Sequence, residues 1–174
     1  MAARAQGADG VELDVHRSRD GELVVHHDAD APTLGVLAEH DFGAIRAALP
    51  WLPTLAETLD ACVGLLVNIE VKNSPGDADF DPEERAAEAV VALLAERAGR
   101  DEILVSSFSL PAIDAVRSLE PSIATGYLTV LDPVPLDALE IANGRGHGAI
   151  HPFYGTLSAE TAPGIVSRAR ELGI

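Results

Sequence analysis

The sequence predicts an α/β protein built around a parallel β-sheet. Short apolar runs typical of strands alternate with amphipathic segments typical of helices along most of the chain. Within one sheet, this alternation gives parallel strands joined by right-handed crossovers. The length of 174 residues corresponds to one domain with a sizeable core. An open doubly wound sheet and a (β/α)₈ barrel both satisfy the pattern, and periodicity does not separate them.

The first predicted strand carries two acidic residues on one face. It spans Gly10–Val15, and because alternate residues of a strand share a face, Glu12 and Asp14 project to the same side. The turn at Asp20-Gly21 leads to a second apolar run that reaches His27. Acids and a histidine at the ends of short apolar runs suggest a site for a hard cation and an acid/base group.

The later elements follow from capping residues, apolar periodicity and chain breakers. Thr54 and Glu57 form a capping box that begins a helix. The run Leu65–Val71 is almost wholly apolar, which is typical of a strand buried on both faces. Asp81 is expected to cap the clearest helix, whose apolar stripe extends to Ala98. The remaining predictions are a helix end over 1–6, a long loop with a helical turn or two over 29–50, strands over 103–108, 123–130 and 148–151, and helices over 110–119, 136–143 and from 159 or 161 to 172.

Composition excludes several functions. A net charge of −16 argues against nucleic acid or an anionic membrane as a partner, because both require clustered Lys and Arg. Cys62 is the sole cysteine, so an intramolecular disulfide and a cysteine-based zinc site are excluded, and we expect it to be a small core residue. The sequence has neither a membrane-spanning run nor the apolar stretch of a signal peptide, so a cytoplasmic location is expected by default.

Glu70 strengthens the case for a bound cation. It interrupts a run too apolar for an exposed strand, and a buried carboxylate needs a partner. A cation and Lys72, which is two residues further and therefore on the same face, are the natural candidates. From the pattern alone, Glu12 and Asp14 fit the solvent face of a half-exposed strand equally well, and Lys72 fits a simple counterion for Glu70. Three carboxylates at strand ends suit Mg²⁺ or Ca²⁺.

The segments GAD-x-VELDV, DG, VV-x-HD and NIEVK, in this order and spacing, resemble the glycerophosphodiester phosphodiesterase family. The resemblance extends from about Gly7 to Gly173 and implies a TIM-type (β/α) barrel. It also implies that Glu12, Asp14 and Glu70 bind a divalent cation, Ca²⁺ or Mg²⁺. The implied reaction hydrolyses a small-molecule glycerophosphodiester to glycerol 3-phosphate and an alcohol, with two histidines as base and acid.

The same resemblance assigns roles to three further residues. His27 matches the family's catalytic histidine, and Lys72 matches a lysine that faces the substrate phosphate. Phe108, in a segment similar to the family's SSF, is a candidate wall of the substrate pocket, and an ordinary packed aromatic is an equally good interpretation. Three other histidines are expected outside the catalytic set: His16, His26 and His151. His16 is expected beyond the end of its strand, and His26 on the opposite face. His151, at the end of a strand, has a weak claim on the substrate pocket, and an exposed loop histidine is the favoured interpretation.

The chain departs from the family pattern at both ends. The family begins with a strand carrying His-Arg-Gly and continues with two more strands after the glycine that matches Gly173. We therefore expect a single partial barrel domain over 1–174, as in a fragment, without its first strand and last two strands. The open sheet edges are expected to favour self-association, and the missing histidine to leave little activity. The alternatives are a catalytically inactive metal-binding or association module and another barrel enzyme with a magnesium–carboxylate site.

Overall fold

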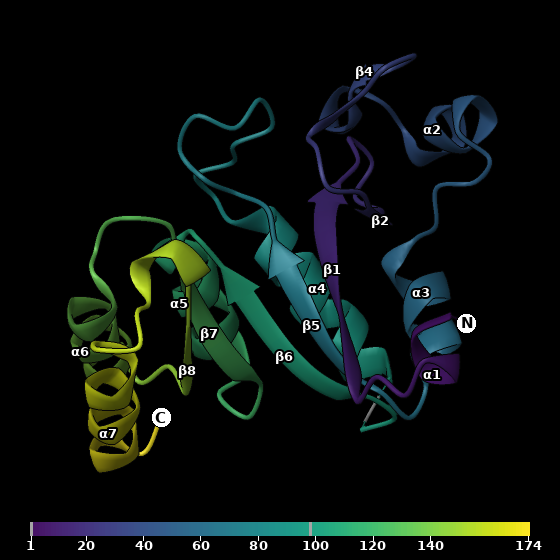
Figure 1. Cartoon of the computed structure of the whole chain (residues 1–174). Helices are drawn as coiled ribbons and strands as arrows, with labels where there is room; N and C mark the ends of the chain where they lie inside the picture. Colours follow the sequence, from purple (N-terminus) through teal and green to yellow (C-terminus); the bar gives the residue numbers. More distant parts are fainter. Residues whose placement is uncertain (1, 98) are drawn as a thin grey trace.

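Within residues 2–97 and 99–174, which the computed structural model describes, six strands form one sheet. The strands are β1 (Gly10–Arg17), β2 (Leu23–Val25), β5 (Leu66–Val71), β6 (Glu102–Ser107), β7 (Ala124–Thr129) and β8 (Ala149–Pro152). Their spatial order is β2-β1-β5-β6-β7-β8 (Figure 1). The pairs from β1 to β8 are all parallel, and β2 is antiparallel to β1. The predicted parallel sheet is therefore confirmed.

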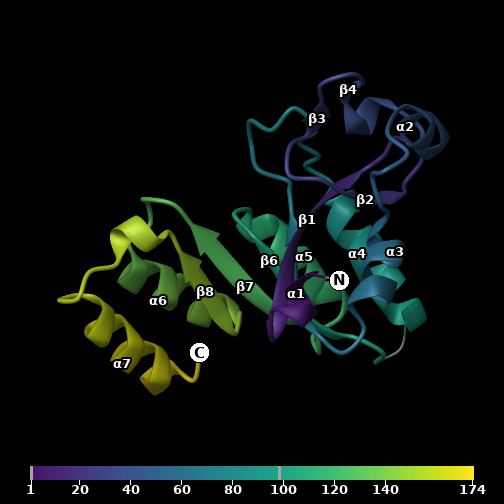
Figure 2. The ribbon, with the colours of Figure 1, turned by 45° about the vertical axis from the view of Figure 1, so that its right-hand side comes forward.

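Helices cover one face of this sheet and leave the other open. The helices are α1 (Ala2–Ala5), α2 (Phe42–Ala48), α3 (Leu55–Cys62), α4 (Arg85–Arg97), α5 (Leu110–Leu119), α6 (Pro135–Arg145) and α7 (Ala162–Leu172). Helices α4 and α5 lie behind the sheet in Figure 1, and the turned view of Figure 2 shows α6 and α7 beside β8. Among the described residues, no helix has the length and hydropathy needed to cross a membrane.

The main core lies between the sheet and α3, α4 and α5. It contains the alternate residues of β1 that the strand pattern assigns to the apolar face, and Cys62 is buried in it as expected. Its buried members are aliphatic: Val15, Leu23, Leu55, Leu59, Val67, Ile69, Val71, Ala86, Ala87, Val90, Val105, Ala112 and Val116. Since Val15 points into this core, its neighbours Asp14 and His16 point to the opposite, open face.

The segment between β2 and α3 is more ordered than the sequence predicts. It contains a short hairpin of β3 (Asp30–Ala31) and β4 (Gly35–Val36), followed by a single 3₁₀ turn over Leu37–Glu39. Helix α2 confirms the helical turns predicted within the loop. The segment has a small core of its own, which includes Leu37 and Ile45, and it stands over the carboxyl end of β1 (Figure 1).

Helix α4 begins later than the sequence predicts. Asp81 was expected to be its cap, but the helix begins at Arg85, and Glu84 before it has a φ of +55°. The cause is Asn73, whose amide both donates to the Asp81 carbonyl at 2.8 Å and accepts from the Asp81 N–H at 2.7 Å. These bonds hold the chain in a turn before the helix. Ala98, at the predicted helix end, lies outside the described residues.

Strand β1 is longer than predicted. It continues to Arg17 because β2 pairs with its last three residues, with Val15 opposite Val25 and Arg17 opposite Leu23. The expectation that His16 lies beyond the strand end is therefore wrong. The other strands and helices agree with the predicted ranges to within three residues at each end.

Candidate active site

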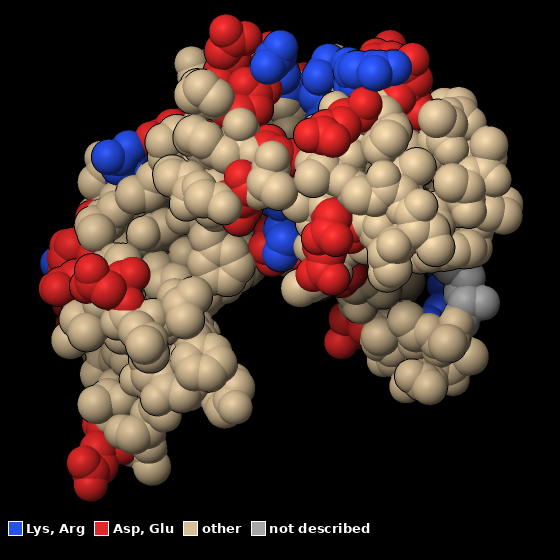
Figure 3. All heavy atoms as spheres, turned by 90° about the horizontal axis from the view of Figure 1, so that it is seen from above, with Lys and Arg blue, Asp and Glu red and all other residues tan. Residues whose placement is uncertain are grey.

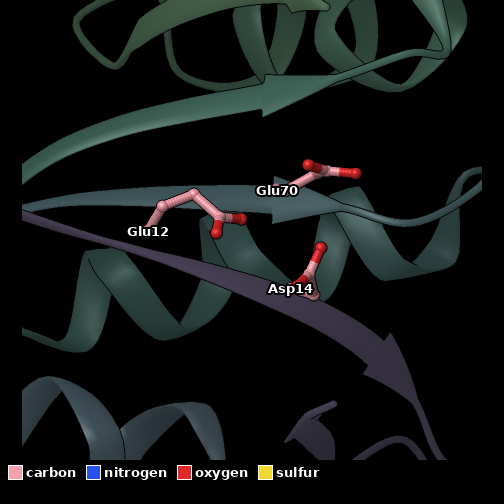
Figure 4. Close-up of side chains that lie close together, drawn as sticks. All are labelled: Glu12, Asp14 and Glu70. Carbon is pink, nitrogen blue, oxygen red and sulfur yellow. The ribbon is translucent and has the colours of Figure 1, made fainter. Parts of the chain in front are cut away.

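Three carboxylates meet at the carboxyl ends of β1 and β5. The parallel register places Glu12 opposite Asn68 and Asp14 opposite Glu70, so all four side chains share one face. One oxygen from each of the three acids lies within 4.8 Å of the others (Figure 4). Sequence reasoning predicted this face for each acid, and the pairing of β1 with β5 brings them together.

Lys72 lies against two of these acids. Its Nζ is 2.9 Å from Glu70 Oε1 and 3.1 Å from Asp14 Oδ1. Burial of the ammonium lowers its pKa, but the hydrogen bonds and charges of Glu70 and Asp14 outweigh burial, so the pKa of Lys72 is raised overall. Lys72 therefore stays protonated and offsets part of the negative charge.

Glu12 is an acid of this cluster whose pKa is raised. Partial shielding from water, together with the charges of Asp14 and Glu70, raises the pKa of Glu12 from 4.5 to about 7. The side chain as a whole is exposed, so solvent screening limits the free energy involved. Near neutral pH, the third carboxylate ionises against two charges that are already present.

These residues fit a hard divalent cation. Three carboxylates and one ammonium sum to −2, and oxygen ligands are those that Ca²⁺ and Mg²⁺ prefer. Two buried side-chain oxygens on the same face, Asn68 Oδ1 and Ser106 Oγ, have no hydrogen-bond partner among the described residues. A bound cation with its water ligands would supply partners for such oxygens.

His27 stands beside this cluster in the loop after β2. Its side chain is 76% exposed, and its Nδ1 is 2.7 Å from Asp28 Oδ1. Together with Lys72 and Asp28 it lines a cavity of about 330 Å³. Figure 3, which looks down on the carboxyl ends of the strands, shows basic side chains enclosed by acidic ones beside a central hollow. The imidazole is therefore free to reach a molecule bound in this cavity.

His16 is a residue that sequence reasoning missed. It shares the face of Asp14, lines the same cavity and is almost fully buried, with its Nδ1 2.6 Å from Asp79 Oδ2. Its Nε2 lies 3.4 Å from the His27 carbonyl. His16 thus ties the loop that carries His27 to the loop after β5. The sequence did contain a signal for His16, because the turn at Asp20-Gly21 indicates a hairpin, and this hairpin extends β1 by two residues.

The other candidate residues are Phe108, His26 and His151, and no side-chain contact joins them to the three acids among the described residues. Phe108 follows β6 and is 40% exposed, so it is not packed in the core. His26 bonds to the Asp28 carbonyl and lies 6.1 Å from the Trp51 ring. His151 belongs to β8, in agreement with the predicted strand over 148–151, but the expectation that it is solvent-exposed is wrong, because its ring lies over Gly126. Burial lowers the pKa of His151.

Comparison with known proteins gives a consistent result. Residues 1–174 match the sequence model of the glycerophosphoryl diester phosphodiesterase family. A glycerophosphodiester phosphodiesterase of Caldanaerobacter subterraneus is 28% identical over an alignment that covers 91% of this chain and 69% of the relative. One from Bacillus altitudinis is 28% identical over 71% of this chain and 56% of its own length. The chain thus spans between about half and two thirds of these relatives.

Solved structures match over almost the whole chain. The glycerophosphodiester phosphodiesterase of Thermotoga maritima superposes with a TM-score of 0.77 at 25% identity, over 99% of this chain and 73% of its own. A phosphodiesterase of Oleispira antarctica, solved with its product sn-glycerol-3-phosphate, gives 0.81 at 24% identity over 97% and 72%. This agreement confirms the expected incomplete TIM-type barrel. The chain belongs to the glycerophosphodiester phosphodiesterase family.

Proposed function

We propose that this protein is a metal-dependent phosphodiesterase that hydrolyses glycerophosphodiesters to glycerol 3-phosphate and an alcohol. The observation that supports this most directly is the convergence of Glu12, Asp14 and Glu70, two of which pair with the Lys72 ammonium, in a chain of this family. The cofactor is a divalent cation, Ca²⁺ or Mg²⁺, held by the three acids. When bound, the cation neutralises negative charge that develops on the phosphoryl oxygens.

Lys72 orients the phosphodiester. Its ammonium is half-buried, is held by two carboxylates and lines the cavity that His27 also lines. A charge fixed in this way contributes more than a solvated one, because it need not reorganise when the phosphate binds. We assign Lys72 both roles, as a partner of the acids and as a phosphate-binding group.

His27 transfers the proton. Asp28 accepts a hydrogen bond from Nδ1, which leaves Nε2 to face the cavity as the acid or base. The hydrogen bond from His27 is also the main reason that the pKa of Asp28 is lowered. A positioned imidazole of this kind typically contributes about 10²–10⁴-fold to the rate.

The test is release of glycerol 3-phosphate from glycerophosphocholine, with and without a chelator. We expect slow release that the chelator abolishes and that added Ca²⁺ or Mg²⁺ restores. His27→Ala should lower the rate by about 10²–10⁴-fold. His26→Ala is the matched control, because that ring faces Trp51, and it should keep most of the rate. Release that survives the chelator, or that is unchanged in His27→Ala, would contradict the proposal.

The second candidate function is an association module that binds a metal without catalysis. The observation that favours it is that β8 stands at one edge of the sheet, beside exposed apolar side chains in the loop after β7. An open edge with apolar surface nearby favours pairing with a second copy of the chain. Self-association is compatible with catalysis, so chelator-sensitive turnover decides between the two functions. With its net charge of −16, we do not expect the protein to bind nucleic acid.

A further inference from the structure

Asn68 lies on the same face of the sheet as the three acids, and together the four side chains form two neighbouring pairs across β1 and β5. Strands β1 and β5 run side by side, with Glu12 opposite Asn68 and Asp14 opposite Glu70. Asn68 also precedes Glu70 by two residues, so the four side chains form two adjacent rows on one face of two neighbouring strands. The resemblance described above gives roles to Glu70 and Lys72 in the segment NIEVK but none to Asn68.

The amide oxygen of Asn68 lacks a partner where one is needed. Oδ1 is shielded from solvent, and no group among residues 2–97 and 99–174 donates a hydrogen bond to it. A buried carbonyl oxygen without a donor has lost its hydration without a replacement, which destabilises the fold. Such an oxygen in a native fold therefore indicates a ligand or a water that satisfies it.

None of the described side chains around Asn68 on this face donates a hydrogen bond to its Oδ1, including that of Ser106, whose Oγ also lacks a partner. Across the sheet, its second register partner is Leu104 of β6, and the preceding residue on the same face of β5 is Leu66. Both are apolar. The two remaining neighbours, Glu12 and Glu70, accept hydrogen bonds when ionised and donate none. A cation or a water on the side of the acids would supply the partner that Oδ1 lacks.

We propose that Asn68 Oδ1 is a fourth protein ligand of the divalent cation, in addition to Glu12, Asp14 and Glu70. A neutral amide oxygen is a normal ligand for hard cations. It adds a donor without adding to the charge of −2 that the three acids and Lys72 already provide. This proposal rests on the proposed function, because it requires a cation at the three acids.

The experiment titrates the purified chain with Tb³⁺ as a luminescent substitute for Ca²⁺, and then displaces it with Ca²⁺. Emission lifetimes in H₂O and D₂O count the water molecules on the bound ion. Asn68→Ala should weaken binding by about tenfold or more and raise the water count by one. Asn68→Asp keeps a side-chain oxygen at this position, so the bound Tb³⁺ should keep the wild-type number of water molecules and bind at least as tightly.

Asn143→Ala is the matched control. It makes the same chemical change at an exposed position on α6, and we expect wild-type binding and hydration. An Asn68→Ala variant with an unchanged water count would overturn the proposal, even if its affinity fell, since the amide would then act through a water. An Asn68→Asp variant that binds as weakly as Asn68→Ala would also overturn it. A wild-type chain that binds no Tb³⁺ would instead refute the cation site of the proposed function.

Discussion

At the scale of single residues, the main feature of the candidate site is repulsion between like charges. Glu12, Asp14 and Glu70 lie within 4.8 Å of one another, and Lys72 neutralises only part of their charge. Burial is the largest cause of the raised pKa of Glu12, and repulsion by Asp14 and Glu70 adds to it. A fold that keeps three carboxylates this close gains stability from any cation that binds among them.

A divalent cation should therefore raise the thermal stability of the chain. At a hundredfold excess over its dissociation constant, Ca²⁺ or Mg²⁺ should stabilise the fold by about 2.7 kcal/mol, since it binds only the native state. Asp14→Asn or Glu70→Gln should weaken this response by removing a ligand. Differential scanning calorimetry with and without cation measures it.

Asp101→Asn serves as the control for this measurement. Asp101 pairs with Arg97 at the opposite end of the sheet, so its removal lowers stability without changing the response to the cation. A melting temperature that millimolar Ca²⁺ and Mg²⁺ leave unmoved would show that the three acids do not bind a metal.

At the scale of secondary structure elements, some elements are positioned by contacts between neighbouring residues and others by contacts between distant ones. Helix α3 is set locally, since the Thr54 hydroxyl accepts from the Glu57 N–H and the Glu57 carboxylate accepts from the Thr54 N–H. The connection from α6 into β8 instead depends on a distant contact. There, buried His147 hydrogen-bonds through Nδ1 to Thr125 of β7 at 2.9 Å.

His147 should make the fold sensitive to acid. Burial lowers its pKa below the usual 6.5, although nearby Asp114 opposes this shift. Below pH 6.5 the unfolded state then binds more protons than the native state, so stability falls as the pH falls. The contribution of this residue to the slope of the unfolding free energy against pH is at most about 1.4 kcal/mol per pH unit. Urea unfolding between pH 7 and pH 5 measures it.

Two variants separate this histidine from other acid-labile groups. His147→Asn keeps an acceptor for Thr125 but does not titrate, so it should flatten the pH dependence. Asp114→Asn removes the charge that favours the imidazolium, so it should steepen the loss in acid. A His147→Asn variant with the wild-type slope would contradict the assignment.

At the scale of the whole molecule, the sheet is open rather than closed. It ends at β8, and it superposes on about 73% of the length of the Thermotoga maritima barrel. Large apolar side chains are exposed in the loops that follow β6, β7 and β8: Phe108, Val130, Leu131, Val134, Phe153 and Tyr154. The edge strand β8 and the loops that follow β7 and β8 lie on the side of the sheet away from β1 (Figure 2).

The chain should therefore self-associate through the edge of β8. Light scattering over a range of protein concentrations should show dimers or larger species. Ala149→Lys places a charge on the edge strand and should shift the equilibrium toward monomers. Ala124→Lys, on the same face of the interior strand β7, is the matched control and should leave association unchanged. A wild-type chain that stays monomeric at all concentrations would contradict the prediction.

Most helices and strands, and the faces of the strands, could be predicted from local sequence patterns. Periodicity of two separates Glu12 and Asp14 from Val15, and the capping box places α3, because both depend on neighbours along the chain. For the same reason the face of Glu70 and Lys72 could be predicted. The motifs then sufficed to indicate the family.

Contacts between distant segments set the features that could not be predicted. Pairing with β2 extended β1 and brought His16 into the site, and the bonds from Asn73 delayed the start of α4. The pairing of β8 with β7 placed the His151 ring over Gly126 and partly buried it. The register of β1 against β5 set Asn68 beside Glu12, and register is fixed by packing between strands rather than by the residues of either strand alone.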